Sequence, residues 1–322
     1  MMKKIFSLAL SLTSLFGVNP SDAQNYPTKM VRIVVPFAAG GNTDFTARSI
    51  GTKLTEVLGQ PFVIDNRPGA STNIGSEMIA KSAPDGYNLL MGGAANAINV
   101  AVLAKVPFDL LHDLTPIVLC VKGANVLSIH PSLPAKTLSE LLSLAKSRPG
   151  QLNYASSGVG SSNHMAAELL KYMAGININH VPYKGNAPAL TDLIGGHVEI
   201  LFSGVPALLP HIKSGRIRPI AIGSPRRFAA APQVPTFEEA GLKGYEASTW
   251  FGLMAPAKTP KEIVSKLNTE VGKILASSDI RDRYQVEGLE PQGGSIESFN
   301  QFILSEIQLY TRVAQAAHLP KL

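Results

Sequence analysis

Short β-branched runs that end in glycine-rich turns and pass into helical spacing recur along this chain, and no other feature restricts its fold as much. Residues 30–37 read Met-Val-Arg-Ile-Val-Val-Pro-Phe, the turn 38–41 reads Ala-Ala-Gly-Gly, and helical spacing begins near Thr43. The same unit recurs at 61–82, and a third strand follows at 87–91. Repeated units of this kind predict an α/β fold, a mostly parallel sheet flanked by helices on both faces.

The pattern stops and restarts once, which predicts two lobes. Residues 114–128 are apolar and extended and predict a first crossing, after which Thr137 and Glu140 form a capping box that opens a new helix. Residues 245–256 predict the return crossing. The chain of 322 residues also exceeds the roughly 100 to 200 residues of one domain. We therefore assign 24–122 with 247–322 to lobe 1 and 123–246 to lobe 2.

The C-terminal region predicts helices that pack back on lobe 1. Thr259 and Glu262 suggest a second capping box, with Pro260 at the favoured first helical position. Residues 295–317 predict a long terminal helix.

The first 23 residues are typical of a signal peptide. Lys3 and Lys4 precede an apolar run at 5–18, and small residues lead to an expected cleavage site after Ala23. The apolar run is shorter than the roughly 20 residues that span a bilayer as a helix. We expect export to the periplasm, with a mature chain that begins at Gln24.

Charge and cysteine content exclude several classes of protein. The formal net charge is +6, but outside the leader the only adjacent basic pair is Arg226-Arg227. Nucleic-acid binders concentrate basic residues on one face or in runs, so we expect no nucleic-acid partner. Cys120 is the only cysteine. An intramolecular disulfide is therefore impossible, and we expect this thiol to be a buried apolar filler.

Three turns rich in glycine and hydroxyl residues follow predicted strands, at 37–44, 156–164 and 183–187. In open α/β sheets, ligands bind beyond the carboxyl ends of the strands. Glycine lets backbone amides approach a solute closely, and a helix start adds free amides and partial positive charge. These turns predict an anion site, with hydroxyls from Thr43, Ser157, Ser161 and Ser162 as further donors. The alternative for these four residues is helix capping alone.

The sequence gives less support to the hypotheses of an enzyme or a metal-binding protein. Ser161 or Ser162 with His164 could suggest a hydrolase, but G-x-S-x-G is missing and the histidine is poorly placed as a base. The histidines lack metal-ligand spacing, and the glycines at 158–160 make an incomplete dinucleotide motif. Asp44 and Asp85 are more simply a helix-start carboxylate and a turn former. We expect no metal, no cofactor and no catalysis.

Six motifs in chain order carry a resemblance to a known family. They are Val-Pro-Phe-Ala-Ala-Gly-Gly-Asn-Thr-Asp at 35–44, Asn-Arg-Pro-Gly-Ala at 66–70, Pro-Asp-Gly-Tyr at 84–87, Tyr-Ala-Ser-Ser-Gly-Val-Gly-Ser-Ser-Asn-His at 154–164, His-Val-Pro-Tyr-Lys-Gly at 180–185 and Trp-Phe-Gly-Leu-Met-Ala-Pro at 250–256. The chain resembles the Bug family, the TctC-type substrate receptors of tripartite tricarboxylate transporters in bacterial periplasms. The resemblance spans essentially the whole mature chain.

The resemblance implies a periplasmic-binding-protein fold, type II-like, whose two lobes are joined by two hinge crossings and close around a carboxylate. It also implies membrane transporter subunits as partners, and we expect a monomer. The residues expected at the ligand are Phe37, Ala38, Ala39, Gly40, Gly41, Asn42, Thr43, Ala70, Ser71, Asn73, Ser156, Ser157, Ser161, Ser162, Asn163, Tyr183, Lys184 and Ser203. The alternative for Lys184 is a solvated surface charge without a role in binding.

One departure from the family pattern bears on the ligand. After the strand predicted at 198–202, family members often carry an acidic residue, whereas this chain has Ser203. A buried ligand amine without a counter-charge would be costly. We therefore expect a di-, tri- or aromatic carboxylate without an amino group. A solute sensor for a signalling partner shares this pocket chemistry and remains open, as does an exported esterase-like hydrolase.

Overall fold

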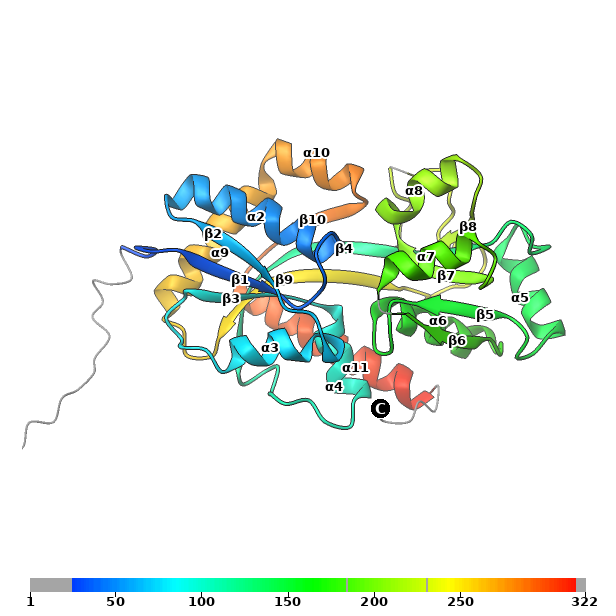
Figure 1. Cartoon of the computed structure of the whole chain (residues 1–322), viewed down its shortest axis with the longest axis horizontal. Coiled ribbons are helices and arrows are strands. Elements are labelled where there is room, and N and C mark those ends of the chain that lie inside the picture. The colour runs from blue at the N-terminus through cyan, green and yellow to red at the C-terminus, as the bar shows by residue number, and fades with distance from the viewer. Residues whose placement is uncertain (1–24, 184, 230, 317–322) are drawn as a thin grey trace, which may run out of the picture.

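The computed structural model describes residues 25–183, 185–229 and 231–316, which form two α/β halves side by side (Figure 1). The expected signal peptide and Lys184 lie outside these residues. Within the described residues, no helix has the length and apolar character needed to cross a membrane.

The first half is built on three parallel strands, with β1 between β2 and β3. Apolar residues of β1 are buried on both faces, as expected for a parallel strand covered by helices on each side. The elements are β1 (Val31–Val35), α2 (Asn42–Leu58), β2 (Phe62–Asn66), the short 3-10 turn η1 (Ala70–Thr72), α3 (Asn73–Ala80), β3 (Asn88–Gly93) and α4 (Ala94–Val102). The strand–turn–helix units predicted from the sequence are confirmed.

The second half repeats the arrangement, with β5 paired in parallel to β6 and β7. Its core surrounds Tyr154, Phe202 and Phe237, which are fully buried. The elements are α5 (Leu138–Ser147), β5 (Asn153–Ser156), α6 (Ser162–Ala174), β6 (Asn179–Pro182), α7 (Asn186–Ile194), β7 (Ile200–Gly204), α8 (Val205–Lys213) and β8 (Arg218–Ile222).

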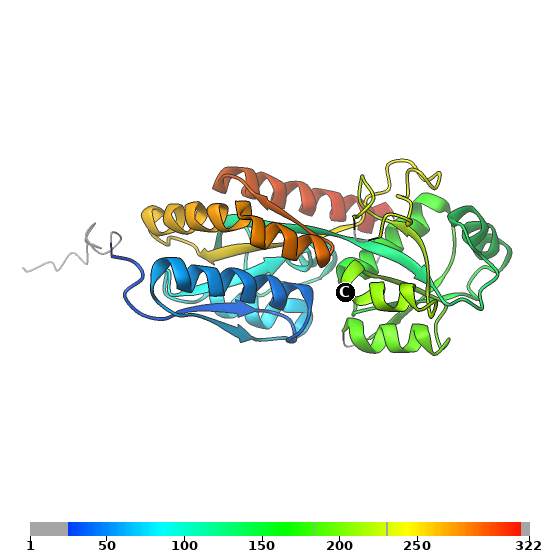
Figure 2. The ribbon, with the colours of Figure 1, turned by 90° about the horizontal axis from the view of Figure 1, so that it is seen from above.

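One long strand, β4 (Leu114–Ile129), belongs to both halves. Its residues 114–124 pair antiparallel with β9 (Ser248–Pro256), whereas 125–129 pair antiparallel with β7 and β8. Figure 2 shows this strand running from one half into the other. The two predicted crossings are therefore confirmed, and their antiparallel pairing makes each sheet mixed at the strands that join the halves.

The C-terminal elements cover the first half, as predicted. Helix α9 (Lys261–Ala276) packs on β4, and α10 (Ser278–Val286) leads into β10 (Leu289–Gly293), which pairs with β4. Helix α11 (Ile296–Ala316) packs on α4. Trp250 anchors it, because the buried indole makes edge-to-face contacts with Phe299 and Phe302.

The two predicted capping boxes differ in outcome. Thr137 Oγ1 accepts from the Glu140 amide at 3.2 Å and Glu140 Oε2 accepts from the Thr137 amide at 3.2 Å, which confirms the first. The second is wrong, because α9 is capped by Pro260 without a side-chain bond. The Thr259 hydroxyl instead donates to the carbonyl of Pro256, at the end of β9, at 2.7 Å.

Candidate functional site

The carboxyl ends of the parallel strands in the two halves face each other (Figure 1), so the predicted turns meet at the junction. Ser71, which follows β2, donates from its hydroxyl to the carbonyl of Val159, which follows β5, at 3.1 Å. This bond joins residues 88 positions apart and links one half to the other. Within the halves, Asn66 Nδ2 donates to the Phe37 carbonyl at 3.1 Å and the Tyr183 amide donates to the Ser156 carbonyl at 3.0 Å, so the predicted turns gather at this junction.

The first turn, 37–44, is held by the buried carboxylate of Asp44. Its Oδ2 accepts from the Gly40 amide at 3.0 Å and from Arg48 Nε at 2.9 Å, while Oδ1 accepts from Asn66 Nδ2 at 3.0 Å. Burial alone would raise the pKa of Asp44, but these three hydrogen bonds outweigh it and the pKa is lowered. Asp44 therefore holds the turn in shape as an anion, which confirms a structural role. The backbone at 38–41 is left exposed.

In the turn at 156–164, the side-chain hydroxyls are hydrogen-bonded to groups of the same turn. Asn163 Oδ1 accepts from the hydroxyls of Ser157 at 2.9 Å and Ser161 at 2.5 Å. Ser161 is also the N-cap of α6, because its oxygen accepts from the His164 amide at 3.3 Å. Capping is thus confirmed for Ser161. The turn also engages its own backbone, because the amides of Ser157, Gly158 and Gly160 donate to side chains of the same region.

Behind this turn, three rings form a column in the second half. The ring of His180 stacks on Tyr154 with centroids 4.9 Å apart and on His164 at 4.1 Å. Burial lowers the pKa of His164 to about 4 and that of His180 to about 3. Both rings are therefore neutral at ordinary pH. His180 Nε2 lies 2.6 Å from Ser156 Oγ, and this contact was not predicted.

The serine–histidine pair considered in the sequence is not arranged for hydrolysis. His164 Nδ1 accepts from the Gly160 amide at 3.2 Å, and the single hydrogen of the Ser161 hydroxyl is shared between the Gly158 carbonyl and Asn163 Oδ1. Ser156 and His180 are within hydrogen-bond distance, but Ser156 is fully buried and the lowered pKa of His180 makes its ring a weak base.

The turn at 183–187 is held by Tyr183 and Asn186. The Tyr183 hydroxyl donates to Asp192 Oδ2 at 2.6 Å, and burial and this bond raise its pKa to about 12. Asn186, which no sequence pattern marked, donates from Nδ2 to Ser203 Oγ at 2.5 Å. Ser203 is fully buried and its hydroxyl is engaged with Asn186. A direct approach of Ser203 to a solute therefore requires this contact to open.

Four helices begin at the junction without a side-chain cap. Their N-caps are Gly41 before α2, Thr72 before α3, Gly185 before α7 and Gly204 before α8. An uncapped helix start leaves amide hydrogens and partial positive charge open to an anion. The junction therefore collects donors from both halves, and it collects them mainly from the backbone.

The predicted site residues divide by exposure. Thr43, Asn73, Ser156, Asn163 and Ser203 are buried and act within the protein. The others are half-buried or exposed, namely Phe37, Ala38, Ala39, Gly40, Gly41, Asn42, Ala70, Ser71, Ser157, Ser161, Ser162 and Tyr183.

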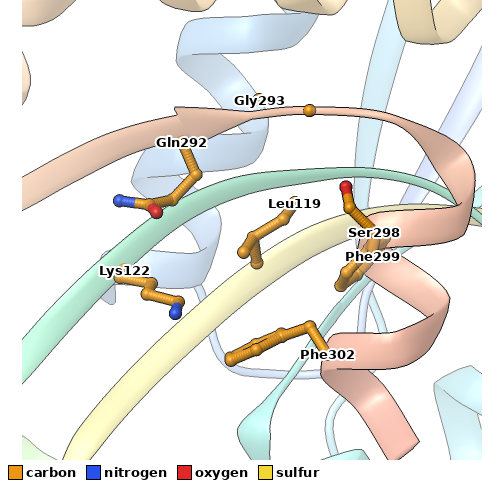
Figure 3. Close-up of a pocket in the computed structure, with 8 residues that line it drawn as sticks. Leu119, Lys122, Gln292, Gly293, Ser298, Phe299 and Phe302 are labelled. Atoms are coloured by element: carbon orange, nitrogen blue, oxygen red, sulfur yellow. The ribbon is translucent and has the colours of Figure 1, made fainter.

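A hollow of about 300 Å³ lies elsewhere, on β4, β10 and α11 (Figure 3). Its lining includes Leu119, Gln292 and Ser298, and Lys122 Nζ lies 4.1 Å above the ring of Phe302. None of its lining residues belongs to the predicted turns. Because the predicted turns meet at the junction of the two halves and not at this hollow, we place the candidate site at the junction.

Comparison with known proteins places the chain in a family. Residues 46–319 match the family model described as "Tripartite tricarboxylate transporter family receptor", TctC. Protein BugT of Bordetella pertussis is 37% identical over 298 residues, which are 92% of this chain and 91% of BugT. The solved structure of Rpa4515 from R. palustris with adipate has a TM-score of 0.87 and 40% identity, covering 92% of this chain and all of that one. MatC from Rhodopseudomonas palustris with bound malate has a TM-score of 0.82 and 33% identity, covering 89% and 99%.

These matches confirm both the resemblance and the two-lobed periplasmic-binding-protein fold. The chain therefore belongs to the TctC family of tripartite tricarboxylate transporter receptors, which includes the Bug proteins.

Proposed function

We propose that this protein is a periplasmic receptor that binds a small carboxylate between its two lobes and delivers it to a tripartite transporter. The observation that carries the proposal is the group of four uncapped helix starts, contributed by both halves to one junction. Two family members with similar structures hold dicarboxylates, adipate in one and malate in the other. Binding alone accounts for these features, so we propose no catalytic step.

The proposed lobes are residues 24–122 with 247–322 and residues 123–246. Each contributes two of the four helix starts: Gly41 and Thr72 on one side, Gly185 and Gly204 on the other. A solute held between them would satisfy amides of both lobes at once. Ligand binding would therefore favour the closed arrangement.

The proposed ligand carries no amino group. The buried Ser203–Asn186 pair occupies the end of β7, and neither side chain bears a charge. A ligand ammonium at this end would lose its hydration without gaining an anionic partner. Dicarboxylates such as malate and adipate present no such group.

A thermal unfolding screen tests the function, with malate, adipate, benzoate and citrate compared with aspartate and glutamate. A ligand at 100 times its dissociation constant adds about 2.7 kcal/mol to the free energy of unfolding. We expect stabilisation by at least one plain carboxylate and little or none by the amino acids. Binding of the amino acids alone would overturn the amine-free proposal. Turnover of ester substrates would overturn the receptor proposal.

A further inference from the structure

Asn99 of α4 joins the turn after β2 to the rest of the first lobe, although no sequence pattern marked it. Its side chain is completely buried. Nδ2 donates to the carbonyl of Ser71 and lies 3.3 Å from Thr72 Oγ1 and 3.2 Å from Asn73 Oδ1. One amide group therefore fastens three consecutive residues.

The turn that Asn99 fastens has an uncommon backbone. Ala70, Ser71 and Thr72 have φ values of 46°, 50° and 79°, the left-handed region that residues with a Cβ rarely adopt. Such conformations persist only where their surroundings hold them. Asn99 supplies three of those contacts, and the Ser71 hydroxyl supplies another through Val159 of the second half.

The other end of the Asn99 amide faces the second half. The Ser71 carbonyl can only accept, so the nitrogen must face it and Oδ1 must point the other way. Oδ1 is buried and has no hydrogen-bond partner among the described residues. A methyl group placed on Gly160 would lie 3.2 Å from this oxygen, which puts Gly160 directly against Asn99.

Gly160 is fixed in place within its own turn. It is buried, its φ is 75°, and its amide donates to His164 Nδ1 at 3.2 Å. The preceding residue, Val159, accepts the hydrogen bond from Ser71. Two consecutive residues of this turn, Val159 and Gly160, thus meet η1 and α4 of the other half.

We propose that Asn99 and Gly160 form a closure seam, in which the side chain that shapes the ligand turn of lobe 1 also sets how closely lobe 2 can approach. The inference rests on the proposed function only in that closure captures the ligand. Asn99 is a positioning residue in this scheme. A side chain at position 160 would press against Asn99 Oδ1 and so favour a wider separation of the lobes.

The first test measures the distance between the lobes directly. Spin labels on Val63→Cys in lobe 1 and Lys146→Cys in lobe 2 report it, since both sites are exposed while the native Cys120 is fully buried. We expect Gly160→Ala to shift the distance distribution of the ligand-free protein toward longer values. The matched control is Gly175→Ala, because Gly175 has a φ of 61° and nothing within 4 Å of an added methyl group. It introduces the same backbone conflict at the other end of α6 without touching lobe 1.

The second test uses Asn99→Ala, alone and with Gly160→Ala. The single change frees the strained turn, so we expect at least a tenfold loss of affinity for malate or adipate, whichever the native protein binds. In the double variant the added methyl group has space, so its effect on the lobe distance should shrink to that of Gly175→Ala. If Asn99 has a purely structural role, Asn99→Ala will lower the melting temperature without changing the effect of Gly160→Ala on the lobe distance.

The outcomes separate the inference from the function. Longer distances in Gly160→Ala than in Gly175→Ala support the seam even if neither probe binds, in which case only the proposed ligand class fails. Equal distances and equal affinities in the two glycine variants overturn the seam, even where the native protein binds malate or adipate tightly.

Discussion

The carboxylate of Asp44 holds the amide of Gly40 at 3.0 Å, so a buried charge fixes the most exposed part of the candidate site. The exposed backbone at 38–41 makes few other contacts that could keep its shape. A mutation of Asp44 should therefore disturb the turn at 37–44 more than a mutation of any other residue in it.

Replacing Asp44 with Asn tests this role. The amide keeps one acceptor oxygen but removes the charge shared by Gly40 and Arg48. We expect a loss of about 1–3 kcal/mol in the free energy of unfolding, the usual cost of a broken charged hydrogen bond, and a weaker affinity for the carboxylate ligand. Urea unfolding and titration calorimetry measure the two effects. Arg48→Gln is the control, because the half-exposed Arg48 should affect stability less. An unchanged affinity in Asp44→Asn would remove the turn from the site.

The buried column of rings predicts sensitivity to acid. The folded-state pKa of His164 is lowered from 6.5 to about 4, so the unfolded chain takes up a proton that the folded protein refuses. The contribution of the neutral His164 ring to the free energy of unfolding is therefore fully present above pH 6.5. It falls as the pH drops toward 4, by up to about 1.4 kcal/mol per pH unit. His164→Gln should flatten that slope relative to the native protein. Unfolding curves at several pH values measure it, and parallel slopes would show that the ring titrates normally.

The buried carboxylate of Glu306 loses hydration when it is charged, and a neutral residue would avoid this cost in the free energy of folding. Burial raises its pKa, although its Oε2 accepts from the Trp250 indole at 2.8 Å. An acid with a raised pKa stabilises the fold below its unfolded pKa, and this contribution is lost as pH rises through the folded value. At pH 7 we therefore expect Glu306→Gln to preserve or increase stability, since the amide oxygen still accepts. Glu306→Ala should lose about 1–3 kcal/mol because the indole is left without a partner. Equal losses in both variants would contradict this account.

The end of β7 predicts a change in ligand preference. Ser203→Asp would place a negative charge next to Asn186, where the native pair is neutral. We expect plain dicarboxylates to bind at least tenfold more weakly because like charges repel, and amino acids to lose less affinity. Calorimetry with malate and aspartate compares the two classes, and Ser203→Ala controls for loss of the hydroxyl. If all three proteins bind malate equally, the end of β7 lies outside the site.

Local sequence patterns were sufficient for the turns and crossings but not for contacts between distant residues. The strands at 31–35 and 114–129 were predicted because β-branched residues and length mark them clearly. Helix α4 was missed because its residues are apolar on nearly every side, and α8 because Pro210 lies inside it. Asn99 and Asn186 act on partners 28 and 17 positions away, a separation that no local period reveals.

The continuity of β4 limits how the two lobes can move. Where it passes between them, Asn125 accepts from the Gly223 amide and donates to the Ala247 carbonyl, while Ala247 donates to Gly223. Three segments of the chain are therefore joined by main-chain hydrogen bonds at this crossing, and a methyl group on Gly223 would come within 2.8 Å of the Ala247 carbonyl oxygen. Opening of the proposed lobes would therefore twist these three segments without breaking their hydrogen bonds, so we expect their amides to exchange with deuterium slowly in every ligand state.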